Sequence, residues 1–169
     1  MRIETERLIL TEFDLNMARA VHENSLDADV RRFLPDEVFE TEEDARETIA
    51  FLIGQYGTDD GPLVYPVLTR THENIGYVQL APVGDGWEIG YHIAAKYTGN
   101  GYATEAVAAF LPVIAEKKGL EEIFGICRKE NAASLRVLEK CGFEPFFRGL
   151  GDYQGEPREI VKTVWRTPR

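Results

Sequence analysis

The chain has 169 residues, of which 44% are hydrophobic and 28% are charged. A chain of this length and composition folds without disulfides or a metal, and disorder, collagen and low-complexity scaffolds are excluded. The formal net charge is −10, and the whole excess lies in residues 1–60, which hold 16 acidic side chains against 6 arginines. Because no basic stripe is present, we expect no nucleic-acid partner. The acidic segment is either a solvated surface or a field that attracts a cationic partner.

The sequence also predicts the cellular compartment of the protein. The longest nearly apolar stretch covers residues 106–115 and contains Pro112, whereas a membrane span needs about 20 residues. The N-terminal segment lacks the apolar core of a signal peptide. Cys127 and Cys141 lie beside apolar residues and form no CxxC pair, so we expect reduced thiols and no metal site. We therefore expect a cytoplasmic protein without a membrane partner, a monomer or homodimer, with one domain over residues 1–169.

Periodicity and capping residues predict the elements of the first half. Residues 6–13 have strand character, and Asp14 fits the N-cap of a helix that ends near Asn24. Thr41 precedes three acidic residues, a pattern that predicts a helix over residues 42–56. Three short β-type runs separated by turn residues then predict an antiparallel meander over residues 63–68, 75–80 and 87–93.

The second half returns to a helical period. The clearest helix begins at Ala103 and contains Pro112, which should kink it. The remaining predicted elements are a strand over residues 123–127, a helix over residues 131–141, and closing strands over residues 143–147 and 159–165. We find no internal repeat and no linker. The order β-α-α-β-β-β-α-β-α-β-β predicts one α+β or mixed α/β domain.

A loop with two glycines, Gly99 and Gly101, connects the meander to the long helix. In such a loop the backbone N–H groups converge, the helix dipole favours negative charge, and the glycines let a ligand approach closely. The arrangement predicts an anion cradle that suits a pyrophosphate. A type I′ hairpin turn at Asn100-Gly101 is the alternative, but it needs a strand where the helical period begins. The P-loop pattern is absent, and Thr104 occupies the third glycine position of the Rossmann pattern.

Two motifs about 30 residues apart carry a resemblance to a known family. The run GNGYATEA at residues 99–106 resembles the acyl-CoA-binding motif of the GNAT acetyltransferase superfamily. The runs NAAS at residues 131–134 and EKCGF at residues 139–143 resemble its second signature, an Asn-initiated helix. The opening TERLIL at residues 5–10 is similar to the subgroup that acetylates the N-termini of ribosomal proteins. One departure is Lys96, where the family usually has Gln or Arg.

The resemblance implies a GNAT-like fold, with a central, mostly antiparallel sheet splayed at a bulge and flanked by about four helices. It also implies direct acetyl transfer from acetyl-CoA to a primary amine, either the N-terminal α-amine of a protein or a small cationic amine, without a metal. The pantetheine arm is expected to pair with the edge of residues 91–93, with Gly90 at the bulge. The residues implied to bind acetyl-CoA are Tyr91, His92, Ile93, Thr98, Gly99, Asn100, Gly101, Tyr102, Ala103, Thr104, Asn131 and Ser134.

The resemblance specifies the catalytic residues less completely. Many relatives protonate the leaving thiolate with a tyrosine, but this chain has Leu138 at that position, so Ser134 is the expected donor. A local backbone bond is the alternative role for Ser134. The candidate bases are Glu88, His92 and Glu12, and we select Glu88. An α-amine with a pKa of about 7.8 is already partly neutral near pH 7, so the lack of a stronger base favours an α-amine acceptor.

Two other functions remain open at this stage. The same fold can hold CoA as a non-catalytic sensor or scaffold, and the cradle can hold another nucleotide phosphate. The charge distribution further predicts that the acceptor is cationic and docks against residues 1–60, while the anionic acetyl-CoA enters from the other side.

Overall fold

The computed structural model describes residues 1–168, and its centre is one eight-stranded sheet. The strands are β1 (Ile3–Glu4), β2 (Leu8–Leu10), β3 (Leu63–Thr69), β4 (Asn74–Val83), β5 (Gly86–Ile93), β6 (Glu122–Arg128), β7 (Glu144–Tyr153) and β8 (Glu156–Arg166). Their spatial order is β1-β2-β3-β4-β5-β6-β8-β7. Neighbouring strands are antiparallel except for β5 and β6, so the expected mixed and mostly antiparallel sheet is confirmed.

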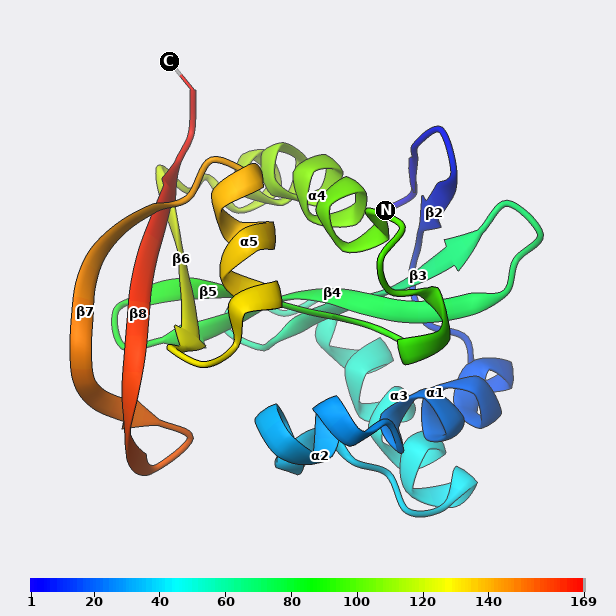
Figure 1. The fold of residues 1–169 in the computed structure, drawn as a ribbon. Helices are drawn as coiled ribbons and strands as arrows, with labels where there is room; N and C mark the ends of the chain where they lie inside the picture. Colours follow the sequence, from blue (N-terminus) through cyan, green and yellow to red (C-terminus); the bar gives the residue numbers. More distant parts are fainter. Residues whose placement is uncertain (169) are drawn as a thin grey trace.

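Helices cover both faces of the sheet (Figure 1). Within the described residues the α-helices are α1 (Ala18–Ser25), α2 (Ala28–Phe33), α3 (Glu42–Gln55), α4 (Tyr102–Lys118) and α5 (Ala132–Lys140). Side chains alternate between the faces along a strand, which divides the core in two. Tyr65 of β3 packs against Phe110 of α4, with ring centroids 5.6 Å apart. Its neighbour Val64 packs with Ile49 of α3 on the opposite face.

Local capping explains the elements that the sequence predicts well. Thr41 Oγ1 accepts a hydrogen bond from the Asp44 N–H at 3.0 Å and so begins α3. Asn131 Oδ1 accepts from the Ser134 N–H at 3.2 Å and begins α5. Each bond satisfies a backbone donor that the helix itself leaves free. Helix α4 continues through Pro112 to its last residue.

Several predicted boundaries are wrong. The first strand shrinks from residues 6–13 to β2, and a separate β1 pairs with it. The five α-helices of residues 1–168 agree with the expected number of about four, and α2 is the one whose position the sequence does not predict. Helix α2 has only six residues and no side-chain cap, so neither hydrophobic periodicity nor a capping residue predicts it. The closing strands extend into the longer hairpin of β7 and β8.

The parallel strands β5 and β6 diverge soon after they meet. One residue pair joins them, Glu88 opposite Phe124. Beyond it β6 turns steeply away from β5 (Figure 1). The predicted bulge at Gly90 is wrong, because β4 and β5 keep one register from Gly76 opposite Ile93 to Val83 opposite Gly86. The edge of β5 beyond Glu88 therefore faces an open gap, without any distortion of its pairing with β4.

Candidate active site

The glycine loop adopts the conformation that an anion cradle requires. Gly99 has φ +82° and Gly101 has φ +79°, a left-handed region that favours glycine. Helix α4 begins directly after Gly101, and no side chain caps it. The N–H groups of its first turn therefore lack intrahelical partners and carry the positive end of the helix dipole. A helix follows the loop, so the alternative of a hairpin turn is wrong.

Arg7, which sequence reasoning missed as a site residue, fastens this loop to the sheet. Its Nη1 donates to the Asn100 carbonyl at 2.9 Å, and its Nε donates to Glu105 Oε1 at 2.7 Å. Its guanidinium also lies over the Tyr102 ring, 4.4 Å from the centroid. The residue is separated from the loop by more than 90 positions in the chain, so local spacing carries no indication of the contact.

The same contacts compensate the negative charge of Glu105, the acidic residue in the first turn of α4. Glu105 also accepts from Thr5 Oγ1 at 2.5 Å and from the Arg7 N–H at 3.1 Å. Burial alone would raise the pKa of Glu105, but the hydrogen bonds from Thr5 and Arg7 bring it below its ordinary value. The carboxylate is thereby ionised, paired with Arg7, and compensated next to a loop that suits phosphate.

A groove of about 380 Å³ follows the free edge of β5. It brings together seven of the predicted acetyl-CoA residues, which are Tyr91, His92, Ile93, Thr98, Ala103, Asn131 and Ser134. The other five form the loop and the first turn of α4, and they are Gly99, Asn100, Gly101, Tyr102 and Thr104. An extended arm with amide groups can lie in such a groove and pair with the strand edge. Lys96 is 68% exposed and lies 3.5 Å from Glu73.

A second cavity of about 290 Å³ occupies the gap between β5 and β6. Ser134, Tyr91 and Glu88 all line it. The Tyr91 hydroxyl donates to the Ser134 carbonyl at 2.9 Å and lies 2.9 Å from Ser134 Oγ. Burial raises the pKa of Tyr91, so its hydroxyl keeps its proton. A tyrosine from β5 thus approaches the place where the expected tyrosine is replaced by Leu138, and sequence reasoning missed this use of its side chain.

Two carboxyl groups with unusual acidity line the same gap. Burial raises the pKa of Glu88 to about 7. Burial, with a contribution from Asp36, also raises the pKa of Glu37 to about 7, although a hydrogen bond with Gln79 opposes the shift. Glu37 accepts a hydrogen bond from the Tyr77 hydroxyl. Glu37 lies in a 3₁₀ turn, Pro35–Glu37, and no sequence motif marks it.

The other two candidate bases are placed differently. His92 Nε2 lies 3.5 Å from Asp27 Oδ2, and burial lowers the pKa of His92, which favours its neutral form. Glu12 instead pairs with the N-terminal ammonium group at 2.9 Å and is 46% exposed.

Gly90 makes room for a neighbouring side chain rather than forming a bulge. A Cβ there would lie 2.6 Å from Gln79 Nε2, which occupies the space between Glu88 and His92.

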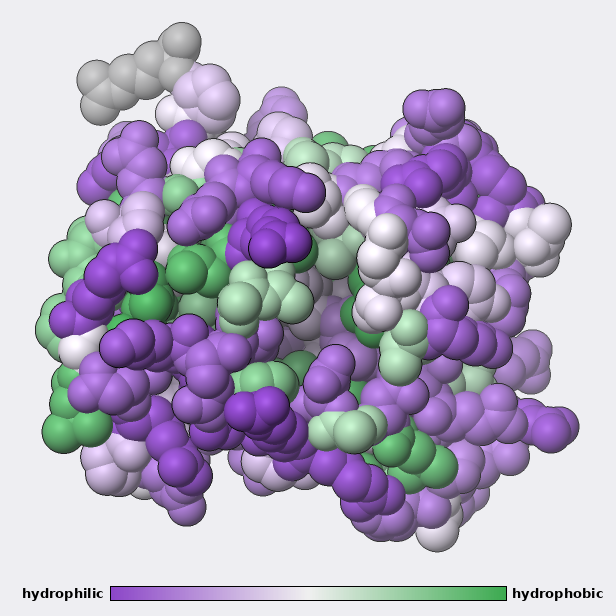
Figure 2. Space-filling model, in the orientation of Figure 1, coloured by the Kyte–Doolittle hydropathy of each residue, from purple (hydrophilic) through white to green (hydrophobic). Residues whose placement is uncertain are grey.

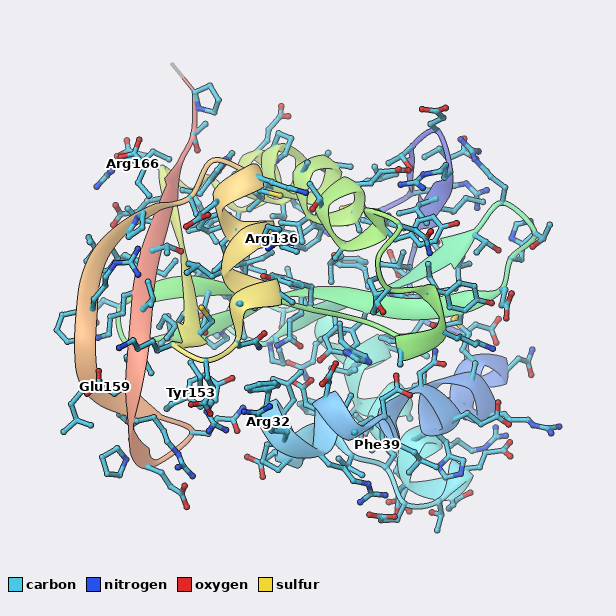
Figure 3. The ribbon with its side chains drawn as sticks, viewed as in Figure 1. Arg32, Phe39, Arg136, Tyr153, Glu159 and Arg166 are labelled. Atoms are coloured by element: carbon cyan, nitrogen blue, oxygen red, sulfur yellow. The ribbon has the colours of Figure 1, made fainter. Side chains whose placement is uncertain are left out.

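The hairpin of β7 and β8 closes the cleft on its outer side. The Tyr153 hydroxyl donates to the Phe33 carbonyl at 3.0 Å and so joins this hairpin to α2. Figure 3 shows Tyr153 and Arg32 near each other on these two elements. Figure 2 shows a hollow near the centre of the face, beside α5. Among residues 1–168, no cluster of three or more His, Cys, Asp or Glu suits a metal ion, and no helix has both the length and the apolar character to cross a membrane.

A splayed sheet with a glycine loop at a helix N-terminus is the arrangement that the resemblance to the GNAT acetyltransferases implies. Residues 7–144 match the family model described as the acetyltransferase (GNAT) domain, and the chain belongs to this family. It is 35% identical to the uncharacterized N-acetyltransferase YnaD of Bacillus subtilis, over 88% of this chain and 86% of YnaD. The chain is an acetyltransferase that uses acetyl-CoA, as the enzymes of this family do.

Solved structures share the fold. A GNAT-family acetyltransferase from Bacillus anthracis superposes with a TM-score of 0.83 at 29% identity, over 98% of both chains. RimL, a ribosomal L7/L12 α-N-protein acetyltransferase in complex with coenzyme A, superposes with a TM-score of 0.84 at 19% identity, again over 98% of both chains. The second comparison concerns the fold alone.

The loop geometry makes Gly101 the sharpest test of the cradle. We expect Gly101→Val to raise the KM for acetyl-CoA at least tenfold, about 1.4 kcal/mol, because a branched side chain meets both an unfavourable φ and the approaching phosphates. Gly119→Val is the matched control, since Gly119 ends the same helix at φ +68°. Steady-state kinetics should show an unchanged KM for that control. Equal effects of the two variants would contradict the cradle.

Arg7 provides a second test. We expect Arg7→Met to raise the KM for acetyl-CoA about fivefold, or about 1 kcal/mol, because Glu105 then carries an uncompensated charge beside the phosphates. Arg2→Met is the control, because it removes an exposed arginine that directly precedes β1, and it should leave the KM for acetyl-CoA unchanged. A further variant, Arg7→Met with Glu105→Gln, should recover part of the loss in the same assay. No recovery would show that Arg7 does not act through Glu105.

Proposed function

We propose that the enzyme transfers the acetyl group of acetyl-CoA to a primary amine by direct attack of nitrogen on the thioester carbonyl. The gap between β5 and β6 carries the proposal. It connects the groove along β5 with a cleft that holds Glu88, Ser134 and Tyr91. Two substrates that enter from opposite sides meet there, so no acyl-enzyme is needed. Residues 1–169 act as one catalytic domain, because β1 and β8 belong to the same sheet.

Acetyl-CoA lies across the loop and the strand edge. Its pyrophosphate binds the loop at residues 98–101 and the first turn of α4, residues 102–104, through backbone N–H groups. Its pantetheine arm follows Tyr91, His92 and Ile93 on one side and α5, from Asn131 to Ser134, on the other. The thioester then reaches the hydroxyl pair of Tyr91 and Ser134.

The reaction moves two protons away from nitrogen. Glu88, whose pKa burial raises to about 7, accepts one proton from the ammonium, and the neutral amine attacks the carbonyl carbon. The C–N bond forms as the C–S bond breaks. Ser134 donates a proton to the departing thiolate, and the second proton on nitrogen restores the Ser134 hydroxyl, while Glu88 releases its proton to solvent. The Tyr91 hydroxyl, 2.9 Å from Ser134 Oγ, orients that hydroxyl and keeps its own proton. The products are the acetylated amine and the free thiol of CoA.

The acceptor is the N-terminal α-amine of a protein or a small cationic amine. Fold neighbours described as acetyltransferases of ribosomal proteins L7/L12 and S5 support the first class. The charge distribution supports a cationic acceptor, because the segment of residues 1–60, which carries the acidic excess, forms α1, α2 and α3 on the acceptor side. A mass-spectrometric screen for acetylated peptides and amines tests the function. Binding of acetyl-CoA with neither thiol release nor product would favour the non-catalytic sensor instead.

The hydroxyl pair is tested by a double-mutant cycle. We expect Ser134→Ala to lower kcat at least tenfold with little change in the KM for acetyl-CoA, because it removes the donor to the thiolate. Tyr91→Phe should lower kcat by a similar factor. The double variant should be no worse than either single variant, since the two hydroxyls act as one unit. A kcat of Ser134→Ala within twofold of the original would remove Ser134 from the mechanism.

The charge of the acceptor is tested by salt. We expect kcat/KM for a basic peptide to fall between about 0.1 M and 1 M salt, because the Debye length shortens from about 10 Å to about 3 Å. A peptide of zero net charge with the same N-terminal residue is the control and should change little. If salt affects both peptides alike, or if acidic peptides react faster, the acidic segment is only a solvated surface.

A further inference from the structure

A third cavity, of about 240 Å³, lies under the 3₁₀ turn Pro35–Glu37, between α1, α3 and the sheet. Its walls are mainly apolar, and they include Phe13, Val21, Phe39, Ile49, Leu52 and Val64. Figure 3 places Phe39 among the helices of this side of the molecule. The acetyl-CoA groove and the hydroxyl pair do not account for this cavity.

Glu37 and Gln79 line both this apolar cavity and the cleft, which is the cavity of about 290 Å³ between β5 and β6, so the two spaces adjoin. Of the carboxylates around the apolar cavity, Glu37 alone also faces the cleft. The Tyr77 hydroxyl holds its side chain in place. Within residues 1–168 neither space is lined by a lysine or an arginine. The junction therefore places a carboxyl group, which a bound ammonium group would hold in its ionised form, between the apolar cavity and the reacting atoms.

We propose that this cavity is the acceptor subsite and that it takes a primary amine bearing one apolar group of up to aromatic size and no carboxylate. The ammonium pairs with Glu37, and the apolar group lies among Val21, Phe39 and Leu52. The carbon chain between them directs the nitrogen toward the gap between β5 and β6. This inference rests on the proposed function, because it specifies the acceptor of the same reaction.

The chemistry of the walls excludes other amines. A polyamine would place its second ammonium among apolar side chains, which is costly without a partner. A free amino acid would bring its carboxylate toward Asp36 and Glu37, and no lysine or arginine among residues 1–168 lines the cavity to pair with it. The cavity is also smaller than the roughly 300–1,000 Å³ of sites for drug-sized ligands, so it suits one side group rather than a whole ligand. Arylalkylamines and the N-terminal residue of a peptide both meet these conditions.

The first experiment compares amines that differ in one group. Phenethylamine and ethylamine share the ammonium and differ by the ring, so burial of the ring should raise kcat/KM at least tenfold. Putrescine and free phenylalanine should react at least tenfold more slowly than phenethylamine. Phenylalaninamide, which lacks the carboxylate, should recover the rate. Equal rates for ethylamine and phenethylamine would overturn the proposal and leave acetyl transfer itself intact.

Two variants with matched controls test the walls. Leu52→Trp should lower kcat/KM for phenethylamine at least tenfold and reduce its ratio to ethylamine, whereas Phe51→Trp alters the adjacent, 55% exposed side chain of α3 and should change neither. Glu37→Gln should raise the KM for phenethylamine at least tenfold with an unchanged KM for acetyl-CoA. Glu47→Gln, an exposed glutamate of α3, is its control. Val21→Leu replaces Leu52→Trp if that variant does not fold.

Calorimetry separates failure of the subsite from failure of the function. Phenethylamine should bind the complex with CoA, and Glu37→Gln should weaken this binding at least tenfold. If no amine is acetylated but phenethylamine binds in this way, the acceptor cavity stands and the proposed function falls. The opposite outcome is that amines are acetylated while phenethylamine binds no more tightly than ethylamine and Glu37→Gln leaves its binding unchanged. In that case the cavity is not the acceptor subsite.

Discussion

The gap between β5 and β6 determines where both substrates can lie. Buried backbone N–H and C=O groups need partners, and an open strand edge inside a fold is therefore a site that a ligand can complete. Here the two strands share one residue pair and then separate, while β6 keeps β8 as its partner on the other side. The hairpin of β7 and β8 is joined to α2 by Tyr153, so the gap is held open as part of the fold.

The alternation of side chains lets β5 serve both substrates. Tyr91 points toward α5 and contacts Ser134, on the side of the acetyl-CoA groove. The intervening residues Glu88, Gly90 and His92 lie opposite Ala81, Gln79 and Tyr77 of β4, on the face that α1 and α3 cover. Cross-strand partners share a face, so this register collects the polar groups of the acceptor side. The absence of a side chain at Gly90 is what lets Gln79 lie between two of them.

The sequence predicts those parts of the site that depend on local chemistry. The cradle at Gly99 and Gly101 follows from left-handed glycines before a helix, and α5 follows from its Asn131 cap. By contrast, Arg7 reaches the loop from the opposite end of the chain, and Glu37 belongs to a 3₁₀ turn that has no periodicity. Their roles arise from tertiary packing, which residue spacing does not encode. The sequence predicts a role for the Tyr91 backbone, whereas the contact between its hydroxyl and Ser134, 43 residues along the chain, comes from the tertiary structure.

The placement of charge is consistent with this division of the molecule. The acidic excess of residues 1–60 lies in the segment that forms α1, α2 and α3, away from the loop that suits phosphate. Glu105, the acidic side chain in the first turn of α4, is paired with Arg7. Arg32 of α2 lines the acetyl-CoA groove with Asp29 and Glu130, and it lies 3.8 Å from Glu130. Among residues 1–168 no lysine or arginine lines the cavity beside Glu37, so in the proposed acceptor subsite the acceptor itself supplies the positive charge.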